Sequence, residues 1–432
     1  MARKILFAAA AAIFAIPVLA QTGNQTQAAP DVSAMEQRMK EMEERIIQLE
    51  GKVRMLETTQ ASAPGAAPAS APSPTPAPAE VGASVAPSAT PTYGGAGGSA
   101  AKALNPDISM IGDFIGSAGA NSAPPLASLQ PFKAFQMHES EIGLQAIIDP
   151  YARGDFFLSF GEEGVDLEEG YITFTALPGS FVAKGGKMRA AFGKVNTLHN
   201  HVLPWIDRPL VTTNLVGGED GIDDAGLSIQ RIIPAPDGLF LEATGQVFRG
   251  DSGDENSPLF HSSRSSDLST VAHLRSYKDL NEATNLDIGF SYARGHNDQG
   301  TDFLTNLYGI DATLRWKPLR RAIYHSFVGR GEFIWSQRQE LPTEQKSFGF
   351  YTSADYQLGR RWFVGGRYDY SERARFSNLL DQGGSVVLTY WPSEFSQIRG
   401  QVRQTRYAES VTANEFLFQF QFAIGAHGAH PF

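Results

Sequence analysis

The stretch from residue 193 to residue 224 holds the side chains of this chain that could do chemistry. His199 and His201 stand two positions apart, and Asp207 and Arg208 follow them. Imidazole nitrogens and carboxylates are ligands of zinc, but a zinc site needs three or four of them in fixed geometry, so a His-x-His pair alone is weak evidence. Two interpretations are open: a metal-ion or anion site, or a surface loop with solvated charges. On the sequence alone, no metal site is assigned.

Motifs for covalent catalysis are missing from the chain. There is no cysteine, which excludes disulfides and thiolate metal sites. Spacings such as Gly-x-Ser-x-Gly, the P-loop and His-Glu-x-x-His do not occur. We therefore predict a protein that is not an enzyme and uses no cofactor, with an enzyme built from scattered loop residues as a third alternative. The formal net charge of −10 argues against nucleic acid as a partner.

Strands are the elements that must position these residues. Near the C-terminus, Phe416, Phe418 and Phe420 alternate with Gln419 and Gln421. Because a strand points successive side chains to opposite faces, one face there is apolar and the other is polar. Roughly sixteen segments of this kind follow the first hundred residues, which predicts an all-β fold, a closed transmembrane antiparallel β-barrel. The alternative is a soluble β-sandwich, which would need two domains, and the sequence shows no second linker.

Inward-facing charges would line the lumen of such a barrel and contact solutes. Basic and acidic residues nearly balance on the polar faces of the strands, so the sequence indicates no ion selectivity. Arg399 and Arg403 are the best candidates for a row of arginines along one wall of the lumen. The alternative is that such charges form salt bridges across the lumen. The pore-lining candidates are Arg153, Lys187, Arg189, Arg315, Arg330, Arg367, Arg399 and Arg403. The candidates for a constriction loop are His199, His201, Asp207 and Arg208, and whether their loop folds inward is open.

The same alternation assigns faces to the strand that precedes this loop. Met188, Ala190 and Phe192 are predicted to face lipid, and Lys187 and Arg189 to face the lumen.

Four regions divide the chain. A positive end, an apolar core and a small-residue cleavage pattern indicate a signal peptide in residues 1–20. Apolar residues spaced by three and four predict a coiled coil in 31–57, with a single amphipathic helix as the alternative. Ala, Pro, Ser and Gly dominate 58–102, which is typical of an extended linker. Residues 103–432 form the predicted barrel.

This architecture resembles the phosphate-selective porin O/P-like family of outer-membrane porins. The resemblance covers nearly the whole chain and rests also on the run Met-Arg-Ala-Ala-Phe-Gly-Lys-Val-Asn from Met188, followed by His199 and by Asp207-Arg208-Pro209. It implies a trimer in the Gram-negative outer membrane whose channels pass anionic solutes. The chain departs from the family in its acidic balance and in lacking a visible lysine cluster.

We therefore expect an outer-membrane porin, a passive diffusion channel for small hydrophilic solutes, anions included. Its expected partners are outer-membrane lipid, small solutes and its own copies in a homotrimer, with a dimer left open. The N-terminal segment would be periplasmic. The alternative is a structural or adhesion barrel that its coiled coil tethers to periplasmic partners.

Overall fold

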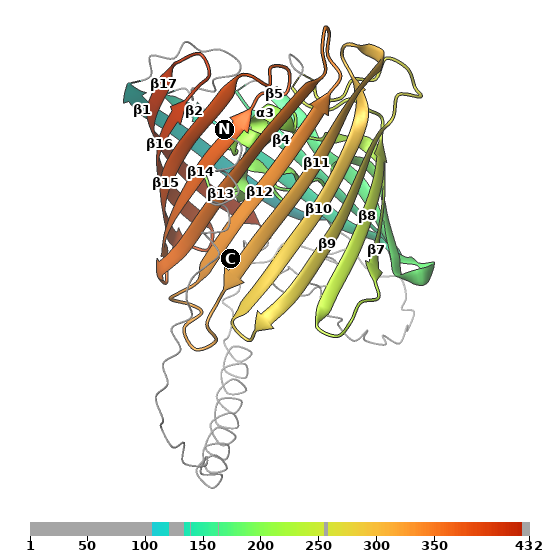
Figure 1. Cartoon of the computed structure of the whole chain (residues 1–432). Coiled ribbons are helices and arrows are strands. Elements are labelled where there is room, and N and C mark those ends of the chain that lie inside the picture. The colour runs from blue at the N-terminus through green and yellow to red at the C-terminus, as the bar shows by residue number, and fades with distance from the viewer. Residues whose placement is uncertain (1–105, 121–133, 139, 163, 255–257, 426–432) are drawn as a thin grey trace, which may run out of the picture. The chain divides into compact units, whose positions relative to one another are not determined.

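The computed structural model describes residues 106–120, 134–138, 140–162, 164–254 and 258–425. The predicted signal peptide, coiled coil and linker lie outside the described residues. Seventeen strands form one sheet (Figure 1). The strands are β1 (Asp107–Ala120), β2 (Phe135–Met137), β3 (Ser140–Asp149), β4 (Ala152–Gly161), β5 (Gly164–Leu177), β6 (Phe181–Arg189), β7 (Asp223–Ile233), β8 (Leu239–Phe248), β9 (Ser269–Asn281), β10 (Thr284–Asn297), β11 (Gly300–Trp316), β12 (Phe327–Arg338), β13 (Gln345–Gly359), β14 (Trp362–Glu372), β15 (Leu380–Ser393), β16 (Ser396–Arg406) and β17 (Thr412–Gly425). The helices are η2 (Pro178–Ser180), η3 (Val195–Thr197), η4 (Asn200–Val202) and α3 (Leu210–Leu215).

The sheet closes on itself. From β3 to β17, each strand pairs antiparallel with the next one in the chain. β1 pairs with both β17 and β3, and the short β2 continues the line of β3 along β1. The result is a closed barrel of sixteen strands, with β2 as an extra piece. The prediction of a closed antiparallel β-barrel of about sixteen strands is confirmed.

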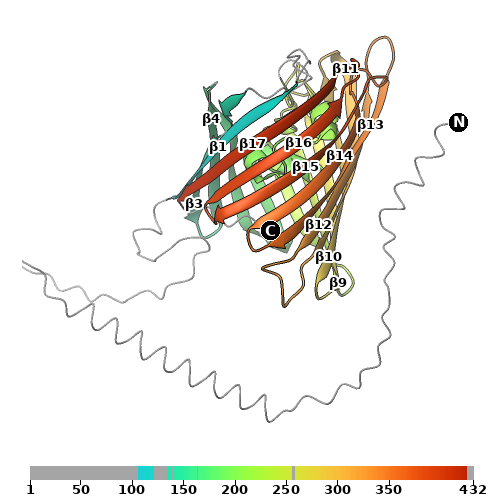
Figure 2. The ribbon, with the colours of Figure 1, turned by 90° about the vertical axis from the view of Figure 1, so that its left-hand side faces the viewer.

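The last strand shows how the wall is built. Phe416, Phe418 and Phe420 of β17 point outward and are exposed, whereas Gln419 and Gln421 point inward and are buried. Figure 2 shows β17 between its neighbours β1 and β16. A water-soluble sandwich would bury the aromatic face. Here the order is reversed, with the apolar side chains outside and the polar ones inside. Among the described residues, no helix is long and apolar enough to cross a membrane.

The two ends of the barrel differ in their connections. The end where β1 starts and β17 finishes carries the tight turns 150–151, 282–283, 360–361 and 394–395. The opposite end carries the two longest connections between consecutive strands, 190–222 and 249–268.

The predicted faces of the strand before residue 190 were wrong. Met188, Ala190 and Phe192 do not face outward: each is at most 1% exposed and lies in the interior apolar cluster. β6 ends at Arg189, and the chain then leaves the wall and turns inward, so Ala190 and Phe192 are not strand residues. The outward face of β6 is marked instead by Ala183 and Gly185, whose partners on β7 are the exposed Ile229 and Leu227.

Candidate functional site

The connection between β6 and β7, residues 190–222, folds into the lumen, and we call it the inner loop (Figures 1 and 2). Its polar contacts reach strands on opposite sides of the closed wall. The Gly193 N–H donates to Ser291 Oγ at 2.8 Å on β10, and the Val195 N–H to Glu332 Oε1 at 2.7 Å on β12. Further along, Gln421 Nε2 on β17 donates to the His201 carbonyl at 3.0 Å. Only a loop inside the barrel can make all three contacts.

Apolar packing holds the inner loop against part of the wall. Trp205, Val211, Leu215 and Val216 of the loop are each at most 1% exposed. They join a buried cluster with inward side chains of the wall, including Tyr351, whose ring meets the Trp205 ring edge-on at 5.2 Å. This segment is therefore a packed core inside the barrel.

Asp207 anchors the same part of the loop by charge. Its Oδ2 accepts hydrogen bonds from Arg367 Nη2 on β14 and Arg403 Nη1 on β16, both at 2.8 Å. Burial raises the pKa of Asp207, but the two arginines outweigh it and hold the pKa well below its usual range. Arg399 Nη1 donates to the Trp205 carbonyl at 3.1 Å. Arg367, Arg399 and Arg403 thus lie buried between wall and loop.

The other sequence candidates are distributed around the barrel. Arg208 is buried and folds the inner loop on itself, with Nε donating to Asn200 Oδ1 at 2.7 Å. Arg189 borders the cavity described next. The remaining four are paired with carboxylates on the strands: Arg153 with Asp155, Lys187 with Asp223, Arg315 with Asp287 and Arg330 with Asp355.

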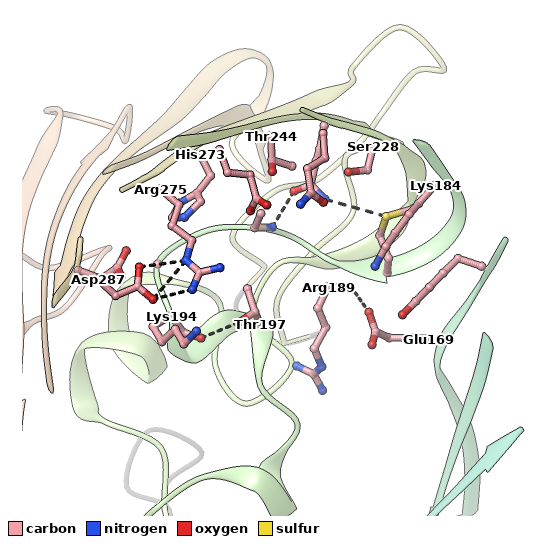
Figure 3. Close-up of a pocket in the computed structure, with 18 residues that line it drawn as sticks. Glu169, Lys184, Arg189, Lys194, Thr197, Ser228, Thr244, His273, Arg275 and Asp287 are labelled. Carbon is pink, nitrogen blue, oxygen red and sulfur yellow. Dashed lines mark hydrogen bonds and ion pairs between the residues drawn. The ribbon is translucent and has the colours of Figure 1, made fainter. Parts of the chain in front are cut away.

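A cavity of about 300 Å³ lies between the inner loop and the wall from β5 to β11 (Figure 3). Its lining mixes charges of both signs. The basic groups are Lys184, Arg189, Lys194, His273 and Arg275, and the acidic ones are Glu169, Glu242, Asp287 and Asp311.

Two pairs show how the cavity charges are arranged. Arg275 binds Asp287 with two nitrogens, Nε–Oδ1 at 2.9 Å and Nη2–Oδ2 at 2.8 Å. Lys194 of the inner loop faces the same wall, and burial lowers its pKa more than the nearby Asp287 raises it. Such an arrangement can bind or filter small polar solutes by size and local field.

Four of the basic lining groups, Lys184, Lys194, His273 and Arg275, were not predicted from the sequence. His273 and Arg275 alternate with the exposed Leu274 on β9, so the period of two carried a usable signal. Lys184 also sits on a strand, but the face of β6 was misassigned. Lys194 lies in the inner loop, where no periodicity could have placed it.

A second cluster lies where the inner loop meets β3 and β5. His199 Nδ1 is 2.5 Å from Glu141 Oε2 and 2.6 Å from Glu168 Oε2, and His199 Nε2 is 2.9 Å from Glu169 Oε2. His201 Nδ1 lies 3.6 Å from Glu141 Oε2. Burial lowers the pKa of His199, but the three carboxylates raise it well above its ordinary value. Of the four constriction candidates, His199 and His201 meet here, while Asp207 and Arg208 lie elsewhere on the loop.

Comparisons with solved structures give low sequence identity. The barrel is similar to the outer membrane channel DcaP of Acinetobacter baumannii, at 10% identity and a TM-score of 0.49 over 74% of this chain and 96% of that chain. It is also similar to OprB of Pseudomonas putida, at 8% identity and a TM-score of 0.46 over 74% of this chain and 94% of that chain.

Comparisons of sequence give one significant relative. No protein-family model matches the chain. A protein of Aquifex aeolicus (strain VF5), described as an uncharacterized protein, is 30% identical over 387 residues, which cover 77% of this chain and 81% of the relative. With this identity over most of both chains, the chain belongs to the family of that Aquifex aeolicus protein.

Proposed function

We propose that this protein is an outer-membrane porin, a passive channel for small hydrophilic solutes, anions included. The observation that carries the proposal is the reversed order of the wall, with exposed apolar side chains outside and buried polar ones inside. A closed barrel with an apolar outer surface suits lipid, and a polar lumen suits water and solutes. The proposal assigns no catalysed reaction to the chain.

The inner loop sets the width of the path. It packs against inward side chains of the wall in a cluster that runs from β6 to β15, and the cavity remains beside it along β5 to β11. Solutes pass there between lysine and arginine side chains, which are positive, and carboxylates, which are negative. Groups of opposite charge lie next to one another along this path. Because neither sign dominates, we expect a filter that acts mainly by size and only weakly by charge.

Single-channel recording of the purified protein in planar bilayers tests this proposal. We expect discrete openings, and a reversal potential under a salt gradient that stays close to zero. A correctly folded protein that gives no openings would overturn it.

A second candidate function is a structural or adhesion barrel with a sealed lumen. The apolar cluster and the buried ion pairs of Asp207 favour it, because they fill much of the interior. In that case the coiled coil predicted in 31–57 would be the functional end of the molecule and would bind periplasmic partners. The bilayer recording separates the two candidates, because a sealed barrel is silent even when the envelope tether is intact.

Self-association belongs to the first candidate. We infer a homotrimer whose coiled coils lie in the periplasm, since the heptad of 31–57 carries charges that pair between parallel copies.

A further inference from the structure

The cluster of two histidines and three glutamates on the inner loop and wall is built from distant parts of the chain. His199 and His201 come from the loop around η4, Glu141 from β3, and Glu168 and Glu169 from β5. Nitrogen and oxygen atoms of Glu141, His199 and His201 all lie within 4.8 Å of one another. Glu141, Glu168 and His201 are each at most 6% exposed. The atoms therefore converge in a site largely shielded from bulk water.

The contacts of His199 Nδ1 cannot all be hydrogen bonds. Two carboxylate oxygens, of Glu141 and Glu168, lie within 2.6 Å of this one nitrogen. A ring nitrogen carries at most one hydrogen and can serve only one of them in good geometry. Correspondingly, both buried oxygens of Glu168 lack a hydrogen bond of acceptable geometry. Buried carboxylates without such partners are costly, and a cation held between them removes that cost.

Glu169 determines which His199 nitrogen is left for such a cation. Its Oε2 lies 2.9 Å from His199 Nε2, and its Oε1 accepts the Arg189 N–H at 2.7 Å, which fixes the carboxylate. A carboxylate that holds the proton on one ring nitrogen leaves the lone pair of the other for a metal ion. The Nδ1 lone pair then points to Glu141 and Glu168.

The charges of the cluster fit a divalent ion. Three carboxylates face two imidazoles and one guanidinium, that of Arg189, whose Nη2 lies 3.6 Å from Glu168 Oε1. Neutrality needs either a second proton on each imidazole or one divalent cation in place of both protons. Mixed nitrogen and oxygen ligands suit zinc and its transition-metal neighbours, whereas magnesium and calcium take oxygen ligands.

We propose that Glu141, Glu168, His199 and His201 form a binding site for a divalent transition-metal ion, with zinc as the best match. Glu169 is the positioning residue that orients His199. The bound ion joins the inner loop to β3 and β5, whereas Asp207 anchors the loop to β14 and β16. This inference goes beyond the channel activity and does not depend on it.

Calorimetric titration of the full chain with zinc chloride tests the site. The protein carries no affinity tag, is stripped of metal with a chelator, and is kept in detergent at neutral pH. We expect saturable binding of one ion per chain. The variants H199A, H201A and E168Q should each weaken binding at least tenfold. E169Q should weaken it less and should alter the visible spectrum of bound cobalt, because the orientation of His199 changes.

Two exposed residues provide matched controls, with His261→Ala for the histidine variants and Glu344→Gln for the carboxylate ones; their side chains are 50% and 44% exposed. Both should bind zinc like the parent chain. E168Q keeps the shape of the side chain, and each variant is compared with the parent by circular dichroism to establish folding. Lack of saturable binding, or equal affinity in folded H199A, H201A and E168Q, would overturn the proposal, whatever the bilayer recordings show.

Discussion

Lys184 and Lys194 bring positive charge to the cavity from two directions, one from β6 and one from the inner loop. Lys184 also lies over the ring of Tyr171, with Nζ at 4.3 Å from the centroid, which keeps the ammonium inside the lumen. In the proposed channel, a fixed charge at this place acts on every ion that passes.

We expect K184Q to shift the channel toward cations. One unit charge at about 10 Å in water is worth about 0.4 kcal/mol, which is about a twofold change in the permeability ratio. The reversal potential under a salt gradient measures this ratio. K346Q is the control, because Lys346 is 68% exposed and pairs with Glu344 outside the cavity. An unchanged reversal potential in K184Q would place the ion path elsewhere.

His138 offers a prediction about pH. Burial lowers its pKa, but hydrogen bonds to Asp113 and to Glu219 of the inner loop raise it from 6.5 to about 10. The pKa of His138 is higher in the folded chain than in the unfolded chain. Its contribution to the stability of the fold is therefore complete below pH 6.5 and is lost as the pH rises through about 10. NMR of labelled histidine side chains should show that His138 is still protonated at pH 8. The variant E219Q should lower the pH at the midpoint of the His138 titration. A midpoint near 6.5 in the parent chain would contradict the pairing.

At the scale of elements, the inner loop depends on one carboxylate. In D207N, Arg367 still has its ion pair with Asp369, and Arg403 still has its ion pair with Glu415. The wall should therefore stay intact. The loop, however, loses two charge-assisted hydrogen bonds, each worth about 1.5–3 kcal/mol. We expect a larger and noisier single-channel conductance, measured in planar bilayers.

The control variant is D237N, in an exposed turn, which should leave the conductance unchanged. Identical traces for D207N and the parent would show that packing alone holds the loop.

The strands were predictable from the sequence where the wall is regular. Phe416 and Gln419 show their faces through a period of two, which is a local property of the chain. The inner loop was not predictable in this way, because its position depends on contacts such as Asp207 with Arg403, which are 196 positions apart. The misassigned Met188 has the same cause, since the strand ends beside it and the chain turns toward partners that alternation does not reveal. The His199 cluster likewise needed Glu141 and Glu168, which only the closed barrel brings near.

At the scale of the whole molecule, the barrel closes without the N-terminal regions. β1 begins at Asp107 and pairs with β17, so removal of 31–57 should leave a folded barrel. By light scattering in detergent, we expect the parent chain to have the mass of a trimer and the deleted chain the mass of a single copy. A variant lacking an equal length of the linker 58–102 is the control. An unchanged mass after deletion of the coiled coil would assign self-association to the barrel itself.

The pairing of β1 with β17 also fixes an order of events in time. The first strand must wait for the last one, so the ring cannot seal before the whole chain has been delivered to the place where it folds. Asp207 also cannot form its ion pair with Arg403 at first, because Arg403 lies nearly two hundred residues further along the chain. Contacts between such distant residues form slowly. The contact of Asp207 with Arg403 is therefore among the last to form, and a chain truncated before β16 has a wall segment but neither a sealed ring nor this anchor of the inner loop.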